Sequence, residues 1–298
     1  MSQNLFQKII FHNKSFIIMR DDLNHPIFSG NKARKLAYIL EDTDSFNNIQ
    51  KIVSFGGNQS NFMLALSQLA KLKNWQFEYW VKPLPKFLKQ SKLGNLKHAI
   101  NNGMILKETR DTLDLETIEK YYIENKNIYF FDQGGRTENA ELGIKQCADE
   151  ILEYTKENKL SEYSVVVASG TGTTALFLEK HIPKKIYTIA CVGSNQYLKK
   201  QMDSINCSLE HPHILSKSFE SNFGQLDIKN HQIHQELLKQ TNIEFELLYD
   251  PIAWRVMLEE YDNLPKPIIY IHCGGTTGNE TMIKRYQRGF SSIISKDI

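Results

Sequence analysis

Short apolar runs alternate along the chain with longer stretches in which apolar residues recur every three or four positions. The runs have the length of strands, and the longer stretches have the period of amphipathic helices. We expect strands at residues 16–19, 52–54, 77–81, 104–106, 165–168, 186–192, 244–247 and 268–271. We expect helices at residues 60–72, 94–101, 142–156 and 231–238, and another that begins near residue 175. This alternation predicts an α/β protein with parallel-type sheets covered by helices.

The order of these elements predicts two lobes, the smaller one inserted into the larger one. We place the smaller lobe at residues 43–132 and the larger lobe at residues 1–42 plus 133–298. Ligands of open parallel sheets bind beyond the carboxyl ends of the strands. Because each lobe has a glycine-rich turn directly after a strand, we expect the ligand to lie in the cleft between the lobes.

The first glycine-rich turn, residues 54–61, reads Ser-Phe-Gly-Gly-Asn-Gln-Ser-Asn. It lies between a predicted strand and a predicted helix, so its N–H groups and polar side chains attract an anion such as a carboxylate. We therefore assign binding of a substrate carboxylate to Asn58, Gln59 and Ser60. An ordinary strand-to-helix turn capped by Ser60 is the alternative.

The second turn, residues 169–175, reads Ser-Gly-Thr-Gly-Thr-Thr-Ala. Its glycines let the main chain approach oxygen atoms, and its threonine hydroxyls and the following helix N-terminus donate hydrogen bonds, which is typical of a phosphate site. The turn also matches the dinucleotide pattern G-x-G-x-x-A. Dinucleotide sites need an acidic residue at the end of the next strand, where this chain has Gly-Ser-Asn at residues 193–195. A cofactor with a single phosphate therefore fits better.

Lys32 supplies an amine upstream of both turns, in the segment Gly-Asn-Lys-Ala-Arg-Lys-Leu at residues 30–36. An amine held against a phosphorylated aldehyde can form a Schiff base, which suggests pyridoxal 5'-phosphate as the cofactor. Taken alone, Lys32 is only part of a basic stretch at the start of a helix. A phosphate-ligand or nucleotide binding protein in which Lys32 forms no covalent bond therefore stays an alternative.

Four separated segments together resemble a known family. They are residues 30–36, 57–61, 169–174 and 271–275, and the last reads Ile-His-Cys-Gly-Gly. In order and spacing they are similar to the D-cysteine desulfhydrases and 1-aminocyclopropane-1-carboxylate deaminases, which are pyridoxal-phosphate enzymes. The shorter segment 132–136 is similar to the family's Gly-Gly-Ser, with arginine in place of serine. The resemblance implies the two-lobed tryptophan-synthase-β-like fold, pyridoxal-phosphate fold type II, with the cofactor in the cleft between the lobes.

The resemblance also implies roles for single residues. Lys32 is implied to bind the cofactor aldehyde and to act in catalysis together with Ser60, which lies near the substrate. Asn61 is implied to contact the ring hydroxyl of the cofactor. Cys273 stands where relatives carry a threonine or serine close to the pyridine nitrogen. The implied phosphate-binding residues are Gly170, Thr171, Gly172, Thr173 and Thr174.

Departures from the family pattern bear on the activity. Shortly after an Asp-Pro pair, characterised members resemble one another in carrying a tyrosine and then a glutamate or threonine, whereas this chain has Ala253 and Trp254. We assign Trp254 to substrate binding. Opening of a cyclopropane ring is implied to need the tyrosine and the glutamate, so we expect a D-cysteine desulfhydrase, which converts a small amino acid to pyruvate, ammonia and sulfide. A 1-aminocyclopropane-1-carboxylate deaminase, and a racemase or catalytically weakened homologue, are the alternatives.

Arg255 and two pairs of histidines are further candidates. Arg255 can reach the cleft as an anion clamp, although a surface ion pair is the more common arrangement for an arginine. The pairs His211–His213 and His231–His234 have spacings that metals use. No third ligand type clusters with them in the sequence, so we expect no metal site.

The composition limits which binding partners and which cellular compartment we expect. A net charge of +2 over 298 residues gives no reason to expect nucleic acid or a membrane surface as a partner. The apolar run at residues 16–19 is far too short to span a membrane. Four widely separated cysteines without a C-x-x-C pair are typical of reduced thiols, so we expect a cytoplasmic enzyme. The resemblance implies a homodimer.

Overall fold

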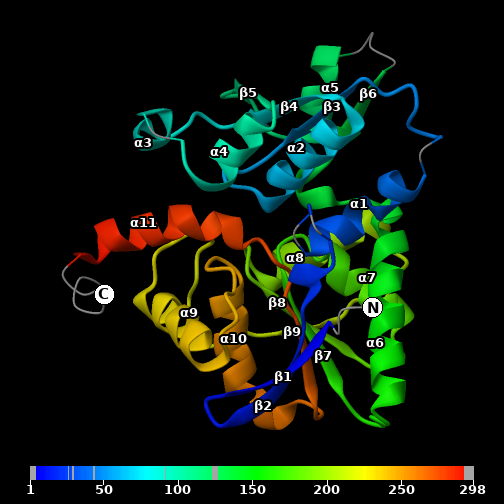
Figure 1. The fold of residues 1–298 in the computed structure, drawn as a ribbon, viewed down its shortest axis with the longest axis vertical. Helices are drawn as coiled ribbons and strands as arrows, with labels where there is room; N and C mark the ends of the chain where they lie inside the picture. The colour runs from blue at the N-terminus through cyan, green and yellow to red at the C-terminus, as the bar shows by residue number, and fades with distance from the viewer. Residues whose placement is uncertain are drawn as a thin grey trace.

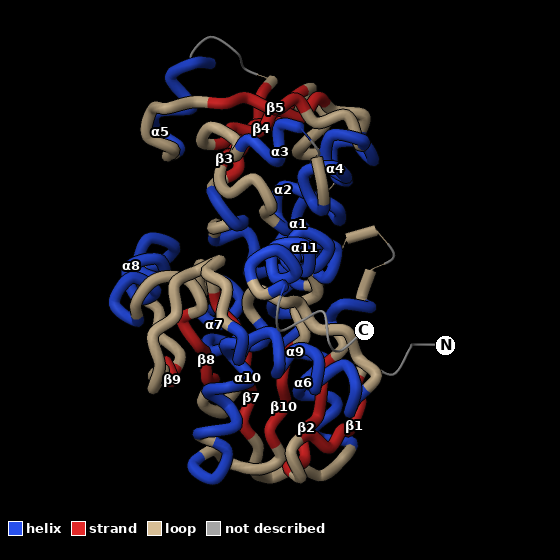
Figure 2. The backbone as a smooth tube through the Cα atoms, turned by 90° about the vertical axis from the view of Figure 1, so that its left-hand side faces the viewer, coloured by secondary structure: helices blue, strands red, loops and turns tan. Residues whose placement is uncertain are grey.

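The structure is a computed structural model that describes residues 5–25, 27–28, 30–42, 44–90, 92–122 and 127–291. Its strands form two separate sheets, and helices α1 (Asn31–Glu41) and α11 (Asn279–Gly289) lie between them in both views (Figures 1 and 2). The predicted α/β class with parallel-type sheets is therefore confirmed.

The larger sheet has six strands in the order β1-β2-β10-β7-β8-β9. β1 and β2 pair antiparallel as a hairpin, and the other neighbours pair parallel. Its strands are β1 (Phe6–Phe11), β2 (Lys14–Met19), β7 (Ser164–Ser169), β8 (Ile186–Ala190), β9 (His213–Leu215) and β10 (Ile268–Ile271). Its further helices are α6 (Glu141–Glu157), α7 (Thr173–His181), α8 (Asn195–Asn206), α9 (Ile228–Thr241) and α10 (Asp250–Glu259).

Both faces of this sheet are covered by helices. Side chains alternate between the faces of a strand, so Val165 and Val167 in β7 pack in the cluster that contains Ile144 of α6, while Val166 packs with Val256 of α10. Burial on both faces explains why β7 reads as a continuous apolar run in the sequence.

The smaller sheet has four parallel strands in the order β5-β4-β3-β6. These are β3 (Lys51–Phe55), β4 (Gln76–Val81), β5 (Ile105–Glu108) and β6 (Ile128–Phe131). The helices beside them are α2 (Asn61–Lys73), α3 (Lys86–Gln90), α4 (Gly94–Asn101) and α5 (Leu115–Glu119). Short 3-10 turns lie at Asp21–Leu23, Lys120–Tyr122, Gln133–Gly135, Glu138–Ala140, Tyr261–Asn263 and Thr276–Gly278.

Helix α1 connects the two lobes. Leu36 and Ile39 of α1 belong to the same apolar cluster as Leu66 of α2, while Gly143 of α6 packs against the backbone of Arg34. All strands of the smaller sheet fall between residues 43 and 132, and the strands of the larger sheet fall outside that range. Because α1 packs on both sides, the exact division into 43–132 and 1–42 plus 133–298 remains our proposal.

The predicted strand at residues 244–247 is wrong, because this segment is an irregular loop. Side chains take the place of a neighbouring strand as its hydrogen-bond partners. His272 Nε2 bonds the carbonyl oxygen of Glu244 at 2.9 Å, and His234 Nε2 bonds that of Phe245 at 3.0 Å. Asn279 Oδ1 accepts from the N–H of Leu247 at 2.7 Å. The apolar pattern signalled burial, but the backbone is satisfied without a sheet.

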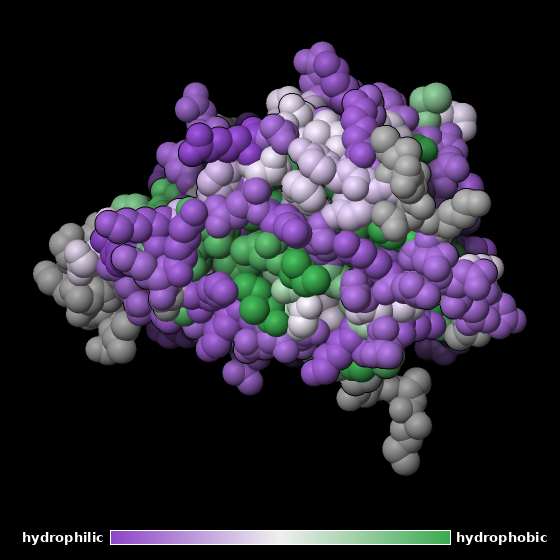
Figure 3. All heavy atoms as spheres, turned by 90° about the horizontal axis from the view of Figure 1, so that it is seen from above, coloured by the Kyte–Doolittle hydropathy of each residue, from purple (hydrophilic) through white to green (hydrophobic). Residues whose placement is uncertain are grey.

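The surface is mostly hydrophilic on the face seen from above, where hydrophobic residues gather in one area near the middle (Figure 3). Within the described ranges, no helix combines the length and the apolar character that crossing a lipid bilayer requires.

Candidate active site

A cleft of about 570 Å³ lies between the lobes. Its size falls in the range of small-molecule sites. The cleft brings together segments that are more than 200 residues apart in the chain. The predicted site residues that line it are Lys32, Asn58, Gln59, Ser60, Asn61, Gly170, Thr171, Gly172, Thr173, Thr174 and Cys273.

Lys32 lies in the first turn of α1 and lines this cleft. Gly30 precedes the helix with a φ of +56°, and a Cβ there would lie 1.9 Å from the carbonyl oxygen of Cys273, so only glycine fits. The N–H of Asn31 donates to that same carbonyl at 3.3 Å. The start of α1 is thus fixed against the Cys273 segment, and this contact positions the Lys32 side chain.

Burial in the cleft lowers the pKa of the Lys32 amine. Lys32 Nζ donates a hydrogen bond to Asn31 Oδ1, and Asn31 Nδ2 donates to Thr174 Oγ1 at 3.4 Å. Asn31 therefore links the amine to the second glycine-rich turn. A lowered pKa increases the fraction of neutral amine, the form that acts as a nucleophile and base.

The first glycine-rich turn presents the N-terminus of α2 to the cleft. Ser60 Oγ accepts hydrogen bonds from the N–H groups of Phe62 at 3.2 Å and Met63 at 3.3 Å, so it is the N-cap of α2. Asn61 Oδ1 accepts from Asn95 Nδ2 at 2.7 Å. The Gln59 amide bonds the carbonyl of Leu93 and the hydroxyl of Thr281 in α11. Both polar contacts of Gln59 hold the turn in place.

The second glycine-rich turn joins β7 to α7. Gly172 has a φ of +78° and precedes Thr173, the first residue of α7. The hydroxyls of Thr171 and Thr173 lie 3.0 Å apart. Free N–H groups at the start of α7 and these hydroxyls together form the type of site that binds a phosphate.

Among the lining residues that the sequence analysis did not identify as site residues are Lys35, Glu246 and Tyr249. Burial, with a further contribution from the nearby Lys32, lowers the pKa of Lys35 to about 7. Lys35 Nζ donates to the carbonyl of Gly134 at 2.8 Å. The sequence held a signal for Lys35, because Lys32 and a residue three positions later share one face of a helix.

Glu246 lies in the loop that was predicted as a strand, and Tyr249 lies shortly after that loop. Burial, together with the nearby Asp250, raises the pKa of Glu246 to about 8. Glu246 Oε2 accepts from the N–H groups of Leu248 at 2.8 Å and Tyr249 at 2.7 Å. The Tyr249 ring packs against Phe223 and lies beside Gly170. No sequence motif identified this loop as part of the site.

Trp254 lies outside the cleft, so its assignment to substrate binding is wrong. Its side chain is fully buried and packs edge-on against Phe16, at 4.8 Å between ring centroids, and against Phe11, at 5.3 Å. Only the start of α10 reaches the cleft, and Trp254 faces the sheet instead. Arg255 does not line the cleft either, because it pairs with Asp227 at 2.6 Å and stacks on Phe219.

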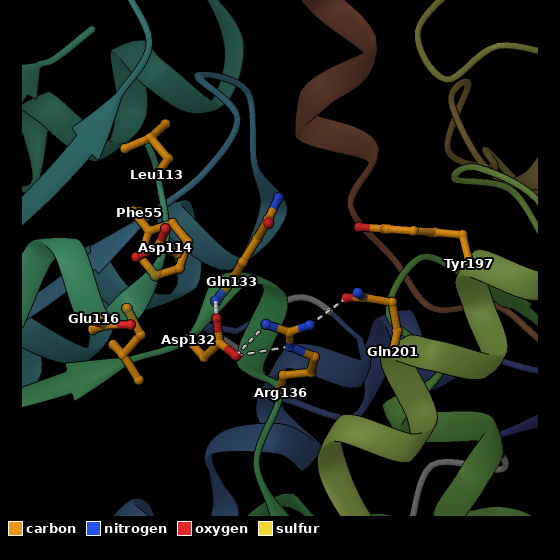
Figure 4. Close-up of a pocket in the computed structure, with 10 residues that line it drawn as sticks. Phe55, Leu113, Asp114, Glu116, Asp132, Gln133, Arg136, Tyr197 and Gln201 are labelled. Atoms are coloured by element: carbon orange, nitrogen blue, oxygen red, sulfur yellow. Dashed lines mark hydrogen bonds and ion pairs between the residues drawn. The ribbon is translucent and has the colours of Figure 1, made fainter. Parts of the chain in front are cut away.

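A second hollow of about 400 Å³ opens beside the cleft and shares Gln133, Tyr197 and Gln201 with it (Figure 4). Arg136 points into this hollow, where Asp132 accepts from its guanidinium at 2.5 and 2.8 Å and Gln201 Oε1 accepts at 2.5 Å. The arginine that replaces the family's serine thus forms a bridge from the segment after β6 to α8.

The histidine pairs have ordinary partners. His211 pairs with Asp203 at 3.0 Å, and His234 bonds the backbone of Phe245. In the part of the chain that the structure describes, no group of three or more histidine, cysteine or acidic side chains is placed to hold a metal ion.

Comparisons with known proteins find relatives of similar sequence and solved structures of similar fold. No family model matches the sequence. The chain is 25% identical over 287 residues to a Thermotoga maritima protein named "Putative 1-aminocyclopropane-1-carboxylate deaminase", covering 88% of each. It is 22% identical over 293 residues to the Arabidopsis thaliana mitochondrial bifunctional D-cysteine desulfhydrase/1-aminocyclopropane-1-carboxylate deaminase, covering 88% of this chain and 72% of that protein.

Solved structures share the fold. A homologue of 1-aminocyclopropane-1-carboxylate deaminase superposes with a TM-score of 0.78 at 21% identity, covering 94% of this chain and 91% of its own. A pyridoxal 5'-phosphate-dependent aspartate racemase superposes with a TM-score of 0.64 at 11% identity, covering 91% and 89%. At these identities the structures establish the fold and not the substrate.

The cofactor of this fold, pyridoxal 5'-phosphate, fits the groups present in the cleft. Lys32 offers a buried amine, the turn from Gly170 to Thr174 offers hydroxyls and a helix N-terminus, and Asn61 offers an amide on the opposite wall. The chain is therefore similar to the 1-aminocyclopropane-1-carboxylate deaminases and D-cysteine desulfhydrases, and it has the fold of type II pyridoxal-phosphate enzymes.

Proposed function

We propose that this protein is a pyridoxal-phosphate-dependent lyase or deaminase of small amino acids, and that it converts D-cysteine to pyruvate, ammonia and sulfide. One observation carries the proposal. The buried amine of Lys32 lies in a single cleft with two anion-binding turns, one on each lobe. Such a site can hold a phosphorylated cofactor by one turn and a substrate carboxylate by the other.

In this proposal the two walls of the cleft bind different groups. The residues from Gly170 to Thr174 bind the phosphate, and the turn that ends at Ser60 binds the substrate carboxylate. Pyridoxal phosphate, when bound, supplies an aldehyde for an amine and a sink for the electrons of a carbanion. The Lys32 amine, whose pKa burial lowers, takes the proton from the substrate Cα.

The D-cysteine reaction needs few further catalytic side chains from the protein. A thiolate leaves without strong acid assistance, so an acid side chain next to the sulfur is not essential. Ser60 is held in place by its two hydrogen bonds to the start of α2 and keeps the substrate carboxylate oriented. The chain's own contribution is therefore positioning and a single proton transfer at Lys32.

Deamination of 1-aminocyclopropane-1-carboxylate is the second candidate. Ala253 and Trp254 argued against it in the sequence, since they replace a tyrosine and a glutamate. In space, however, Tyr249 and Glu246 bring the same two side-chain types into the cleft. Both curated relatives also carry that deaminase activity in their names. These observations support the deaminase as an equal alternative.

The first experiment tests the cofactor chemistry. Purified protein incubated with pyridoxal phosphate should show a visible absorption band, and reduction with borohydride should fix a pyridoxyl group on the peptide that contains Lys32. A Lys32→Ala variant should lose the fixed group and about a thousandfold of the turnover rate. A pyridoxyl group on another lysine, or no visible band at all, would contradict the proposal and would favour a non-covalent phosphate-binding protein.

The second experiment identifies the reaction. Release of pyruvate is measured from D-cysteine, L-cysteine and D-serine, and release of 2-oxobutyrate from 1-aminocyclopropane-1-carboxylate. The proposal expects D-cysteine to give the highest kcat/KM. Faster turnover of the cyclopropane substrate would establish the deaminase instead, and interconversion of enantiomers without keto-acid release would point to a racemase.

A further inference from the structure

Arg285 lines the cleft from helix α11, outside the four segments that resemble the family. Its Nη2 donates to the carbonyl of Gly224 at 2.6 Å, and its Nη1 lies 3.1 Å from the sulfur of Met282. A guanidinium has five N–H donors, so these two contacts leave donors for another partner. Arg285 is therefore a cation at the wall of the site with spare hydrogen-bonding capacity.

The absence of an acidic partner sets Arg285 apart from other partly buried arginines. Among the described residues, no carboxylate lies within 4 Å of its guanidinium, whereas four other arginines have such a partner. Those four are Arg20, Arg34, Arg136 and Arg255. An unneutralised guanidinium in a cleft is suited to bind a carboxylate or a similar anion through paired hydrogen bonds.

The position of Arg285 relates it to the turn assigned to the substrate carboxylate. Thr281 Oγ1 donates to Gln59 Oε1 of that turn at 3.2 Å. Arg285 follows Thr281 by four residues, so both lie on one face of α11, and their backbones are about 6 Å apart along the helix axis. Arg285 therefore lies one helical turn from the residue of α11 that contacts the Ser60 turn.

The charges of the cleft favour a second anion. Lys32, Lys35 and Arg285 are the cationic side chains in its lining, and Glu246 and Asp250 are the acidic ones. Burial raises the pKa of both Glu246 and Asp250, which lowers the tendency of each to carry a negative charge. The acidic side chains in the lining therefore repel an incoming anion weakly.

We propose that Arg285 is the specificity residue of this site and binds a second anionic group, at the end of the substrate side chain, through its guanidinium. Amino acids with a carboxylate or another anion beyond Cβ are then bound more tightly than their neutral isosteres. This inference rests on the proposed function, since it assumes that the amino acid binds between Lys32 and the Ser60 turn.

The test uses the holoenzyme and the change in its cofactor absorption on ligand binding. The ligands are the isosteric pairs aspartate and asparagine, and glutamate and glutamine, each in both enantiomers. In the wild-type protein at least one acid should bind about tenfold more tightly than its amide, as expected for one charge-assisted hydrogen-bonded pair. Arg285→Gln should remove that difference, and Arg285→Lys should restore part of it.

Lys284→Gln is the matched control, because Lys284 lies on the same helix, is half exposed and pairs with Glu280. It should leave the preference for acids unchanged. Equal binding of acid and amide to the wild-type protein would overturn the inference. An Arg285→Gln variant that binds the acid and the amide more weakly by the same factor would also overturn it. That result would mean that Arg285 only stabilises the Gly224 segment. Both results leave the trapping at Lys32 unaffected, so the proposed function is tested separately.

Discussion

At the scale of single residues, burial shifts the pKa values of several cleft side chains. The amine of Lys32 has a lowered pKa, and that of Lys35 falls to about 7. The pKa of Glu246 rises to about 8. In each case removal of water from the charged form is the largest cause. The site thus gathers amines with lowered pKa values and a carboxyl group with a raised one, which suits proton transfer.

Glu246 should make the stability of the protein depend on pH. In the folded protein its carboxyl holds a proton up to about pH 8, whereas the unfolded chain releases that proton near the ordinary value of 4.5. The folded state therefore binds more protons across this window, and stability falls as the pH rises through it. Glu246→Gln cannot titrate but can still accept from Leu248 and Tyr249. We expect the melting temperature of the variant, relative to wild type, to increase from pH 5 to pH 8.5.

Calorimetry of both proteins across this range checks the expectation. Glu162→Gln, which changes an exposed glutamate paired with Lys184, should follow the wild-type profile. Parallel profiles for wild type and Glu246→Gln would mean that Glu246 is ionised in the folded protein at neutral pH.

At the scale of elements, the proposed anion binding depends on the N-termini of two helices. α2 begins after Ser60 and α7 begins at Thr173, and each follows a central strand of its sheet. Residues 244–249 contribute to the site without belonging to a helix or strand. Their apolar pattern predicted a strand, but the segment is an irregular loop that places Glu246 and Tyr249 in the cleft.

Ser60→Ala should have two separable effects. Loss of the N-cap should destabilise the protein by about 1 kcal/mol. Loss of the hydroxyl at the substrate turn should also raise KM for the amino acid. Ser194 caps α8 through the N–H of Tyr197 at 3.1 Å and does not itself line the cleft, so Ser194→Ala is a matched control. It should lower stability by a similar amount without a change in KM. Equal KM values for the two variants would refute a substrate role for Ser60.

At the scale of the whole molecule, the site exists only because the two lobes face each other. Polar contacts hold them together on two sides of the cleft. The Gly94 N–H donates to Glu280 Oε2 of α11 at 3.0 Å, and Arg136 bonds Gln201 of α8. The hydrogen bond from Gly94 is the leading reason why the pKa of Glu280 lies below its usual range.

Glu280→Ala should weaken cofactor binding by about fivefold, since loss of one hydrogen bond between the lobes costs about 1 kcal/mol. Titration of the cofactor-free protein with pyridoxal phosphate measures the affinity, and hydrogen exchange of the Gly94 amide reports the local opening. The exposed Glu162→Ala should change neither quantity. An unchanged Gly94 exchange rate in Glu280→Ala would show that this contact does not hold the lobes.

Much of the architecture could be read from local signals. The predicted helices at 60–72, 94–101 and 142–156 are confirmed as α2, α4 and α6. Continuous apolar runs identified the buried parallel strands, because such strands have no solvent-facing side. The prediction of a strand at 244–247 was wrong because an apolar pattern indicates burial and not the hydrogen-bond partners of the backbone. His234, His272 and Asn279 supply those partners from other elements.

The sequence by itself determined the lysine, the two glycine-rich turns and many of the strands and helices, because caps, glycines and apolar periodicity act over a few residues. Only the tertiary structure decided that Trp254 enters the core and that Glu246, Tyr249 and Arg285 line the cleft. These placements depend on the direction in which each element packs against distant ones. Local sequence carries no signal for that direction, since it is the packing of the two lobes that sets it.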